Sequence, residues 1–269
     1  MDVIDRMKQG EKISIGMVHT PALPGSFDYK GASMESIIEY CVKDAKTLEE
    51  AGFPAIIVAN DNDGPMHPEG MNKLQFASLT IIVKKVREAV CCDVGVCCGG
   101  DFTAGIDIAR AVGGVSMVRI PYYVDIRVSP YGLCFPNSNE VLWRRKEDGE
   151  DDIKILADIQ IKHTVALKDG ISIEESALWA IANRADCIIV TGVATGAETS
   201  TSDMARVKKV SSVPVIAGSG VSESNIVEQY ATCDGAIIGS SLKKNKDLRN
   251  PIEKNLAERL IKAMKGEKE

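Results

Sequence analysis

The sequence predicts a single (β/α)8 barrel of the TIM type, and three observations support this prediction. A short apolar run rich in β-formers, a polar loop and an amphipathic helix follow one another eight times in the 269 residues. The runs start roughly 20 to 40 residues apart, which is the length of a βα unit. They are nearly continuous in apolar residues, as expected of parallel strands buried on both faces.

The predicted strands cover, in chain order, residues 13–20, 55–61, 93–98, 114–120, 155–162, 187–192, 214–219 and 235–240. Helical periodicity fills the gaps, for example over residues 34–50, 73–90, 172–183 and 252–264. A doubly wound open sheet is the alternative, but it normally carries a Gly-rich loop after its first strand. Here that strand runs into "VHTPALPGS". No linker divides the chain, so we expect one domain over residues 1–269 with its core at about 13–265.

Charge and hydropathy exclude several classes of partner. The net charge is -6 and no basic patch or Lys/Arg run stands out, which disfavours nucleic acid and anionic lipid. No apolar run reaches the roughly 18 residues of a membrane span. The N-terminal "MDVIDRMKQGEK" lacks the apolar centre of a signal peptide. We therefore expect a cytoplasmic protein without a membrane span, in which a homo-oligomer remains possible.

The eight cysteines fall mostly inside apolar runs, which predicts reduced, buried thiols and no disulfide framework. Cys91, Cys92, Cys97 and Cys98 could be interpreted as a metal cluster. Their spacing is not the CxxC of zinc sites, and neighbouring residues of a strand point to opposite faces. A structural role is favoured.

Candidate functional residues lie where the strands end, because barrel active sites sit at the C-terminal ends of the strands. His19 ends the first strand and could act as acid, base or ligand near pH 7, or simply bond to the Pro-rich loop. Asn60 follows the second strand. Asp61 and Asp63 come next and could hold Mg²⁺, although such residues are also common in turns. No cofactor is required by the sequence.

The fifth strand, "ILADIQIKH", carries the most polar residues. Two-residue alternation predicts that Asp158, Gln160 and Lys162 share one face and that His163 lies on the other. Lys162 could form a Schiff base, act as a base or hold an anion; the alternative is a structural Asp158–Lys162 ion pair. Arg119, in the fourth strand, needs a buried partner, either a carboxylate or a bound anion.

The last three strands end in small polar residues that suggest an anion site. The sixth offers Thr191 and Thr195, and a helix is expected from Ser222 after the seventh. Phosphate sites of these barrels are typically built from the loops after strands seven and eight with a helix N-terminus. The predicted phosphate-binding residues are Gly218, Ser219, Gly220, Gly239 and Ser240.

A long segment follows the fourth strand, "PYYVDIRVSPYGLCFPNSNEVLWRRKEDGEDD", residues 121–152. Long loops inside a compact domain are usually functional or mobile. This one lies on the side where barrel active sites are built, so we expect it to contribute to the site.

Six motifs together resemble the BtpA family, which includes SgcQ-like proteins: "GMVHTPALPGS", "VANDNDGP", "ADIQIKH", "VTGVATG", "PVIAGSGVSESN" and "DGAIIGSSLK". The resemblance implies a TIM barrel of the ribulose-phosphate-binding type. The family takes its name from a role in photosystem I accumulation in cyanobacteria. Many members come from organisms without photosynthesis, often beside sugar-metabolism genes, which implies an enzyme of phosphosugar or nucleoside metabolism.

Two segments depart from the family pattern, both at the active end. "GVCCGGD" stands where "GVNVLRND" is expected, so the Asn and Arg of that segment are absent. After the fourth strand, "RIPYYVDIRVSPYGL" replaces an Arg-Val-Asn run. A substrate different from that of other members is therefore expected.

The predicted function is binding of a phosphorylated small molecule, with an aldolase, isomerase or lyase step. His19, Asn60, Asp158, Lys162 and His163 are the catalytic candidates. One alternative is metal-assisted hydrolysis or transfer at a glycosidic or phosphate bond. Another is a non-catalytic assembly or regulatory factor, since this fold hosts unrelated functions.

Overall fold

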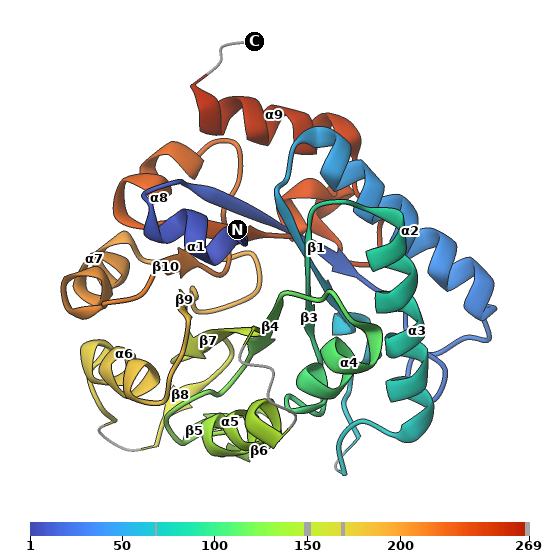
Figure 1. Ribbon diagram of the computed structural model, residues 1–269, viewed down its shortest axis with the longest axis horizontal. Coiled ribbons are helices and arrows are strands. Elements are labelled where there is room, and N and C mark those ends of the chain that lie inside the picture. The colour runs from blue at the N-terminus through green and yellow to red at the C-terminus, as the bar shows by residue number, and fades with distance from the viewer. Residues whose placement is uncertain (68, 148–151, 168–169, 267–269) are drawn as a thin grey trace.

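The computed structural model describes residues 1–67, 69–147, 152–167 and 170–266. Eight parallel strands close into a barrel in the order β1-β11-β10-β9-β7-β4-β3-β2. Helices surround the barrel (Figure 1). The closed, all-parallel barrel confirms the predicted TIM fold.

All eight predicted strands are present in the barrel. They are β1 (Ile13–His19), β2 (Ala55–Ala59), β3 (Asp93–Cys97), β4 (Met117–Ile120), β7 (Lys154–Ile159), β9 (Cys187–Val190), β10 (Val215–Ala217) and β11 (Gly235–Ile238). The helices are α1 (Val3–Lys8), α2 (Met34–Ala51), α3 (Lys73–Ala89), α4 (Ala104–Val112), α5 (Ser138–Glu147), α6 (Ile173–Ala182), α7 (Thr201–Val210), α8 (Ile226–Thr232) and α9 (Lys254–Lys265). The helix expected from Ser222 begins later, at Ile226, because the Ser222 N–H instead donates to the Asn225 side chain in a turn.

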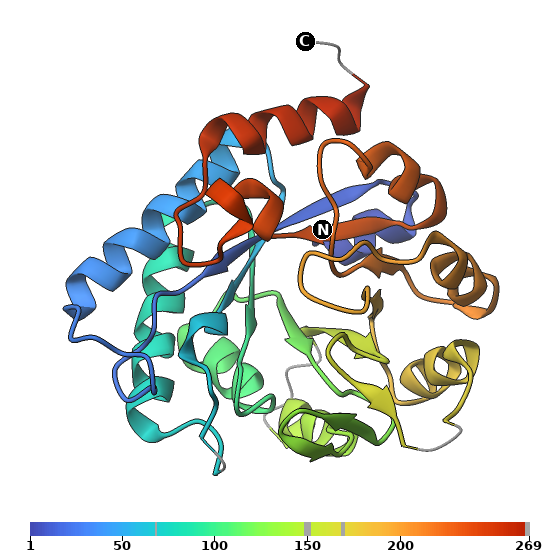
Figure 2. The same ribbon diagram turned by 180° about the vertical axis from the view of Figure 1, so that it is seen from behind.

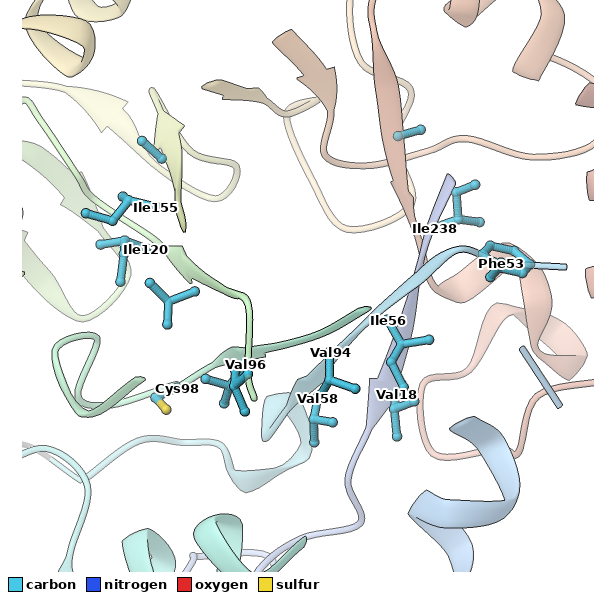
Figure 3. Close-up of a cluster of buried hydrophobic side chains, with 14 of the residues drawn as sticks. Val18, Phe53, Ile56, Val58, Val94, Val96, Cys98, Ile120, Ile155 and Ile238 are labelled. Carbon is cyan, nitrogen blue, oxygen red and sulfur yellow. The ribbon is translucent and has the colours of Figure 1, made fainter. Parts of the chain in front are cut away.

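Two apolar cores follow from the two-residue period of the strands. In β1, Ile13, Ile15 and Met17 point into the barrel, whereas Val18 joins the layer between strands and helices. Figure 3 shows that outer layer, where side chains such as Val58 and Val94 from neighbouring strands lie together. The same period directs His19, the last residue of β1, into the barrel.

Helix α1 closes the N-terminal end of the barrel. Val3, Ile4 and Met7 are buried in the same cluster as the interior strand residues. The Val3 N–H donates to the side chain of Asp93, the first residue of β3 (2.8 Å). Figure 1 shows α1 near the centre of the ring of helices. Access to the interior is therefore left to the opposite, C-terminal end.

A small antiparallel sheet is added at that C-terminal end. It consists of β5 (Arg127–Ser129), β6 (Gly132–Cys134) and β8 (Val165–Ala166), in the order β6-β5-β8. Figures 1 and 2 show it beside α5 and α6. The long segment after β4 thus forms a hairpin and a helix; its residues 148–151 lie outside the described part of the chain. In the described residues, no helix has both the length and the apolar character needed to cross a membrane.

Candidate active site

A buried ion pair between Arg119 and Asp158 stands at the C-terminal end of the barrel interior. The Arg119 Nε donates to one carboxylate oxygen at 2.8 Å and Nη2 donates to the other at 3.0 Å. Burial alone would lower the pKa of Arg119, but the Asp158 carboxylate outweighs it and the pKa is raised. The partner required by Arg119 is therefore a carboxylate, and the alternative that pairs Asp158 with Lys162 is wrong.

Lys162 reaches the mouth of the barrel from beyond the end of β7. Its backbone N–H donates to the Thr191 Oγ1 at 2.8 Å, which ties it to the end of β9. Within the described part of the chain, its ammonium group makes no hydrogen bond or ion pair. Burial, and next the charge of Arg119, lower the pKa of Lys162, while Asp61 and Asp158 act in the opposite direction. The result is a largely buried amine that loses its proton more readily than an ordinary lysine.

The prediction that Gln160 shares a face with Asp158 and Lys162 is wrong. β7 ends at Ile159, and Gln160 has a left-handed backbone with φ of 45°. Strand alternation stops there, so the Gln160 amide turns away and donates to the Ile171 carbonyl and the Ser176 hydroxyl, each at 3.0 Å. Gln160 therefore fixes the turn onto α6.

His19 is buried beside Asp61. Its Nε2 lies 3.3 Å from an Asp61 carboxylate oxygen, and its Nδ1 is buried and has no hydrogen-bond partner among the described residues. Burial lowers the pKa of His19 to about 4 against the opposing effect of Asp61. A Cβ on Gly239 would lie 2.7 Å from the His19 ring, so glycine at 239 makes room for the imidazole. His19 is therefore held in its neutral form at pH 7, and burial makes it a weaker base than an ordinary histidine.

Asn60 and Asp63 hold the loops together. The Asn60 side chain accepts from the Gly99 N–H (2.6 Å) and donates to Asp63 (2.8 Å). The two Asp63 oxygens also accept from the Leu23 N–H and the Gln75 amide. Both Asp63 oxygens are occupied, and one Asp61 oxygen faces His19, so among the described contacts the predicted Mg²⁺ pair keeps a single unbonded oxygen, on Asp61. In the described residues no group of three or more His, Cys, Asp or Glu could hold a metal ion.

A cavity of about 1000 Å³, here called the mouth cavity, opens above these groups. It reaches from the ends of β2 and β3 to the hairpin that follows β4. Its lining includes Asp61, Cys97, Phe102, Tyr122, Lys162 and His163. Burial raises the pKa of the Cys97 thiol to about 12, so Cys97 is no ready nucleophile.

A second cavity of about 590 Å³ shares Lys162 and His163 with the mouth cavity. It also contains Arg127, from β5, whose Nε donates to the Thr164 hydroxyl at 3.1 Å. Burial lowers the pKa of Arg127, with Asp125 opposing. The sequence analysis did not predict a role for Arg127 or for the aromatic residues of the mouth cavity. The unusual length of the segment after β4 is the feature of the sequence that pointed to this region.

The loops after β9, β10 and β11 converge on one another, as the predicted phosphate site requires. Gly220 has φ of 70° and packs directly against the backbone of Ala197. A Cβ on residue 220 would lie 2.3 Å from the Ala197 carbonyl oxygen, so only glycine fits at this position. A Cβ on Gly196 would lie 3.5 Å from the Ser240 hydroxyl oxygen. The Ser241 hydroxyl donates to the Val221 carbonyl (2.7 Å).

Some of the predicted phosphate-binding residues are already used in contacts within the protein, and others keep groups that a ligand could bind. The Ser219 hydroxyl accepts from the Gly192 N–H and donates to the Ala197 carbonyl, so it is occupied. Gly218 is packed against Ile189 and Thr191. Ser240 begins a 3-10 turn (Ser240–Leu242), where the first N–H groups have no acceptor within the helix. None of these residues lines the mouth cavity, so the converging loops and the mouth cavity are separate parts of the C-terminal end.

His163 and Thr195 are brought together across two loops. The His163 Nε2 accepts from the Thr195 N–H at 3.1 Å and lies 2.9 Å from its hydroxyl. The exposed His163 ring thus links the loop after β7 to the loop after β9.

The cysteines interpreted as structural are free thiols placed at opposite ends of β3. Cys91 and Cys92 precede the strand, and their N–H groups donate to the Glu49 side chain. Cys97 and Cys98 lie at its C-terminal end and are buried. No four-cysteine cluster can form from these positions.

Comparison with known proteins places this geometry in a family. The model of the BtpA family matches residues 10–266. The chain belongs to the BtpA family. An uncharacterised protein of Pyrococcus furiosus is 36% identical over 94% of both chains. The photosystem I biogenesis protein BtpA of Synechocystis is 30% identical over 93% of this chain and 87% of its own length.

Solved structures support the fold. (S)-3-O-geranylgeranylglyceryl phosphate synthase from Thermoplasma acidophilum, in complex with its substrate sn-glycerol-1-phosphate, matches with a TM-score of 0.63. The match covers 99% of both chains at 12% sequence identity. At that identity the likeness concerns the barrel alone.

Proposed function

We propose that this BtpA-family protein is an enzyme acting on a phosphorylated small molecule of the phosphosugar or nucleoside class. The observation that carries the proposal is the Lys162 amine, which is largely buried, without a partner among the described residues, and shifted toward its neutral form. Only the neutral amine attacks a carbonyl carbon. The phosphate-bearing substrate of a structural neighbour supports the ligand class.

Neutral Lys162 would condense with a substrate aldehyde or ketone, releasing water, and the imine would take up one proton from the solvent. The imine draws electrons from the adjacent carbon, so that a C–C bond or a C–H bond there can break. The Asp61–His19 pair, of which Asp61 lines the mouth cavity beside Lys162, would accept the proton released and return it to the enamine carbon, which restores the imine. Hydrolysis of the imine would return the amine and the product.

The phosphate would bind at the converging loops after β9, β10 and β11. Ser240 has a hydroxyl beside Gly196 and begins a turn whose first N–H groups lack internal acceptors. Backbone N–H groups of this kind bind anions without a basic side chain. The mouth cavity would then hold the rest of the substrate.

Borohydride trapping tests the role of Lys162. Aldose and ketose phosphates, such as ribose 5-phosphate and ribulose 5-phosphate, are incubated with the protein and reduced, and the adduct is located by peptide mass spectrometry. We expect one adduct at Lys162, absent in Lys162→Met and retained in Lys154→Met, which changes the other end of the same strand. Equal labelling of many surface lysines, with none preferred, would contradict the proposal.

Ser240→Asp tests the phosphate site. A carboxylate at 240 would repel a bound phosphate, whereas Ser240→Asn has a similar size without the charge. Calorimetry should show an affinity for ribose 5-phosphate lower by more than about tenfold in the Asp variant only, or about 1.4 kcal/mol. Equal affinities of the two variants for ribose 5-phosphate would show that its phosphate does not bind at these loops.

A non-catalytic assembly role is the second candidate, because the Synechocystis relative is named a photosystem I biogenesis protein. That role predicts phosphosugar binding without imine formation or turnover. Trapping at Lys162 would decide against it.

A further inference from the structure

The outer wall of the mouth cavity is aromatic. Phe102, Tyr122, Tyr131 and Phe135 all line it, and they come from the loop after β3 and the segment after β4. The Phe102 and Tyr122 ring centroids lie 5.4 Å apart at an interplanar angle of 59°. Tyr131 is 79% exposed and Phe135 is 62% exposed. A planar ligand entering the cavity would cover these faces.

The backbone at Tyr122 supports a binding role for this wall. Tyr122 has φ of 51°, in the left-handed region that bulky residues rarely adopt. Backbone strain of this kind costs free energy and is found mostly at active sites and ligand-binding positions. Here the strained residue is the one whose ring meets Phe102.

The charges along the same wall are acidic. Asp61, Glu69, Asp101 and Glu140 line the mouth cavity. One Asp101 oxygen accepts from the N–H groups that start α4, one Glu140 oxygen is paired with Arg144, and one Asp61 oxygen faces His19, so each of these three carboxylates keeps a second oxygen for a ligand. Four carboxylates disfavour a phosphate at this wall, so we expect the uncharged end of a ligand here and its phosphate at the loops that contain Ser240. Carboxylates accept hydrogen bonds, so they select a group that carries N–H donors.

The size of the cavity agrees with a ligand larger than a simple sugar phosphate. Its volume of about 1000 Å³ is at the upper end for small-molecule sites. Lys162 lines the same cavity as the aromatic wall. One ligand can therefore contact both.

We propose that the mouth cavity binds the planar nitrogen heterocycle of a nucleotide-like ligand, stacked on Tyr131 and the Phe102–Tyr122 pair. The carboxylates of the wall accept hydrogen bonds from the N–H groups of the ring. This inference deepens the proposed function and rests on it, since the sugar phosphate portion occupies the site described above. It concerns binding alone and requires no imine at Lys162.

Equilibrium binding of AMP, GMP, CMP and UMP, each compared with ribose 5-phosphate, tests the inference. At least one mononucleotide should bind about tenfold more tightly than ribose 5-phosphate, as expected when one base stacks on an aromatic side chain. Tyr131→Ala, at an exposed position, and Phe102→Leu should each remove most of that advantage and leave the affinity for ribose 5-phosphate unchanged.

Trp143→Ala is the matched control. Trp143 is 71% exposed on α5 and does not line the mouth cavity, so this variant should bind every probe normally. If ribose 5-phosphate binds and no mononucleotide binds more tightly, the heterocycle inference fails and the phosphate site stands. If no probe binds, both fail. An equal loss in Tyr131→Ala and Trp143→Ala would overturn the inference as well.

Discussion

Protonation of His19 should destabilise the folded protein in mild acid. In the folded chain the pKa of His19 is about 4, whereas an unperturbed histidine has a pKa of about 6.5. Between these values the unfolded chain binds a proton that the folded chain does not. Stability therefore rises with pH through this window, and it falls as the pH drops from 6.5 toward 4. A difference of about 2.5 between the two pKa values corresponds to roughly 3 kcal/mol at pH 4.

Urea unfolding of the wild type and of His19→Gln, measured from pH 7.5 to pH 4.5, isolates this contribution. Carboxylates titrate in both proteins, so their effects largely cancel in the difference. We expect the unfolding free energy of the wild type to fall by about 2–3 kcal/mol more than that of His19→Gln over this range. Parallel pH profiles, or an NMR titration of His19 with a pKa above 6, would refute the argument from burial.

Three further predictions concern the same end of the barrel. Asp158→Asn leaves the buried Arg119 charge uncompensated and should lower the free energy of unfolding by about 3–5 kcal/mol. The double variant Arg119→Met with Asp158→Leu removes both charges and should recover most of this loss. Chemical denaturation measures both variants, and a loss below about 1 kcal/mol in Asp158→Asn would contradict a tight pair. Lys162→Met should leave the melting temperature unchanged or raise it, because it removes a buried charge, and the rise in stability with pH toward the ordinary lysine pKa should weaken in this variant. A large fall in melting temperature would mean that the amine has a structural partner. Thiol titration in denaturant without reductant should find eight free cysteines, and stoichiometric zinc or a consistent loss of four thiols would overturn this.

The sequence predicted the barrel because its strands are buried on both faces and its helices have a clear apolar period. Apolar runs marked all eight barrel strands, and Ser172 and Asn72 form capping boxes at the helix starts expected near them. The N-terminal helix α1 was not predicted, since six residues give too little periodicity. Its role is tertiary, in closing the barrel.

The site was harder to predict, because strand-end polar residues serve both ligands and loops. Asn60, Asp63 and Ser219 satisfy backbone groups of neighbouring loops, and those partners lie far away in the sequence. Gln160 was misplaced because one left-handed residue ends the alternation on which the prediction depended. The sequence also could not show that the loops after β9, β10 and β11 lie apart from the mouth cavity, because this depends on contacts between segments that are distant in the sequence.

Lys162 is the residue at this end whose placement packing does not explain. Arg119 and Asp158 satisfy each other, and His19 is accommodated by Gly239 and faces Asp61. Burying an ammonium group without a partner costs free energy, which the lowered pKa only partly relieves. Methionine or leucine at position 162 would fill the same space without that cost. A lysine that lines a cavity large enough for a substrate therefore supports the proposed role of its amine.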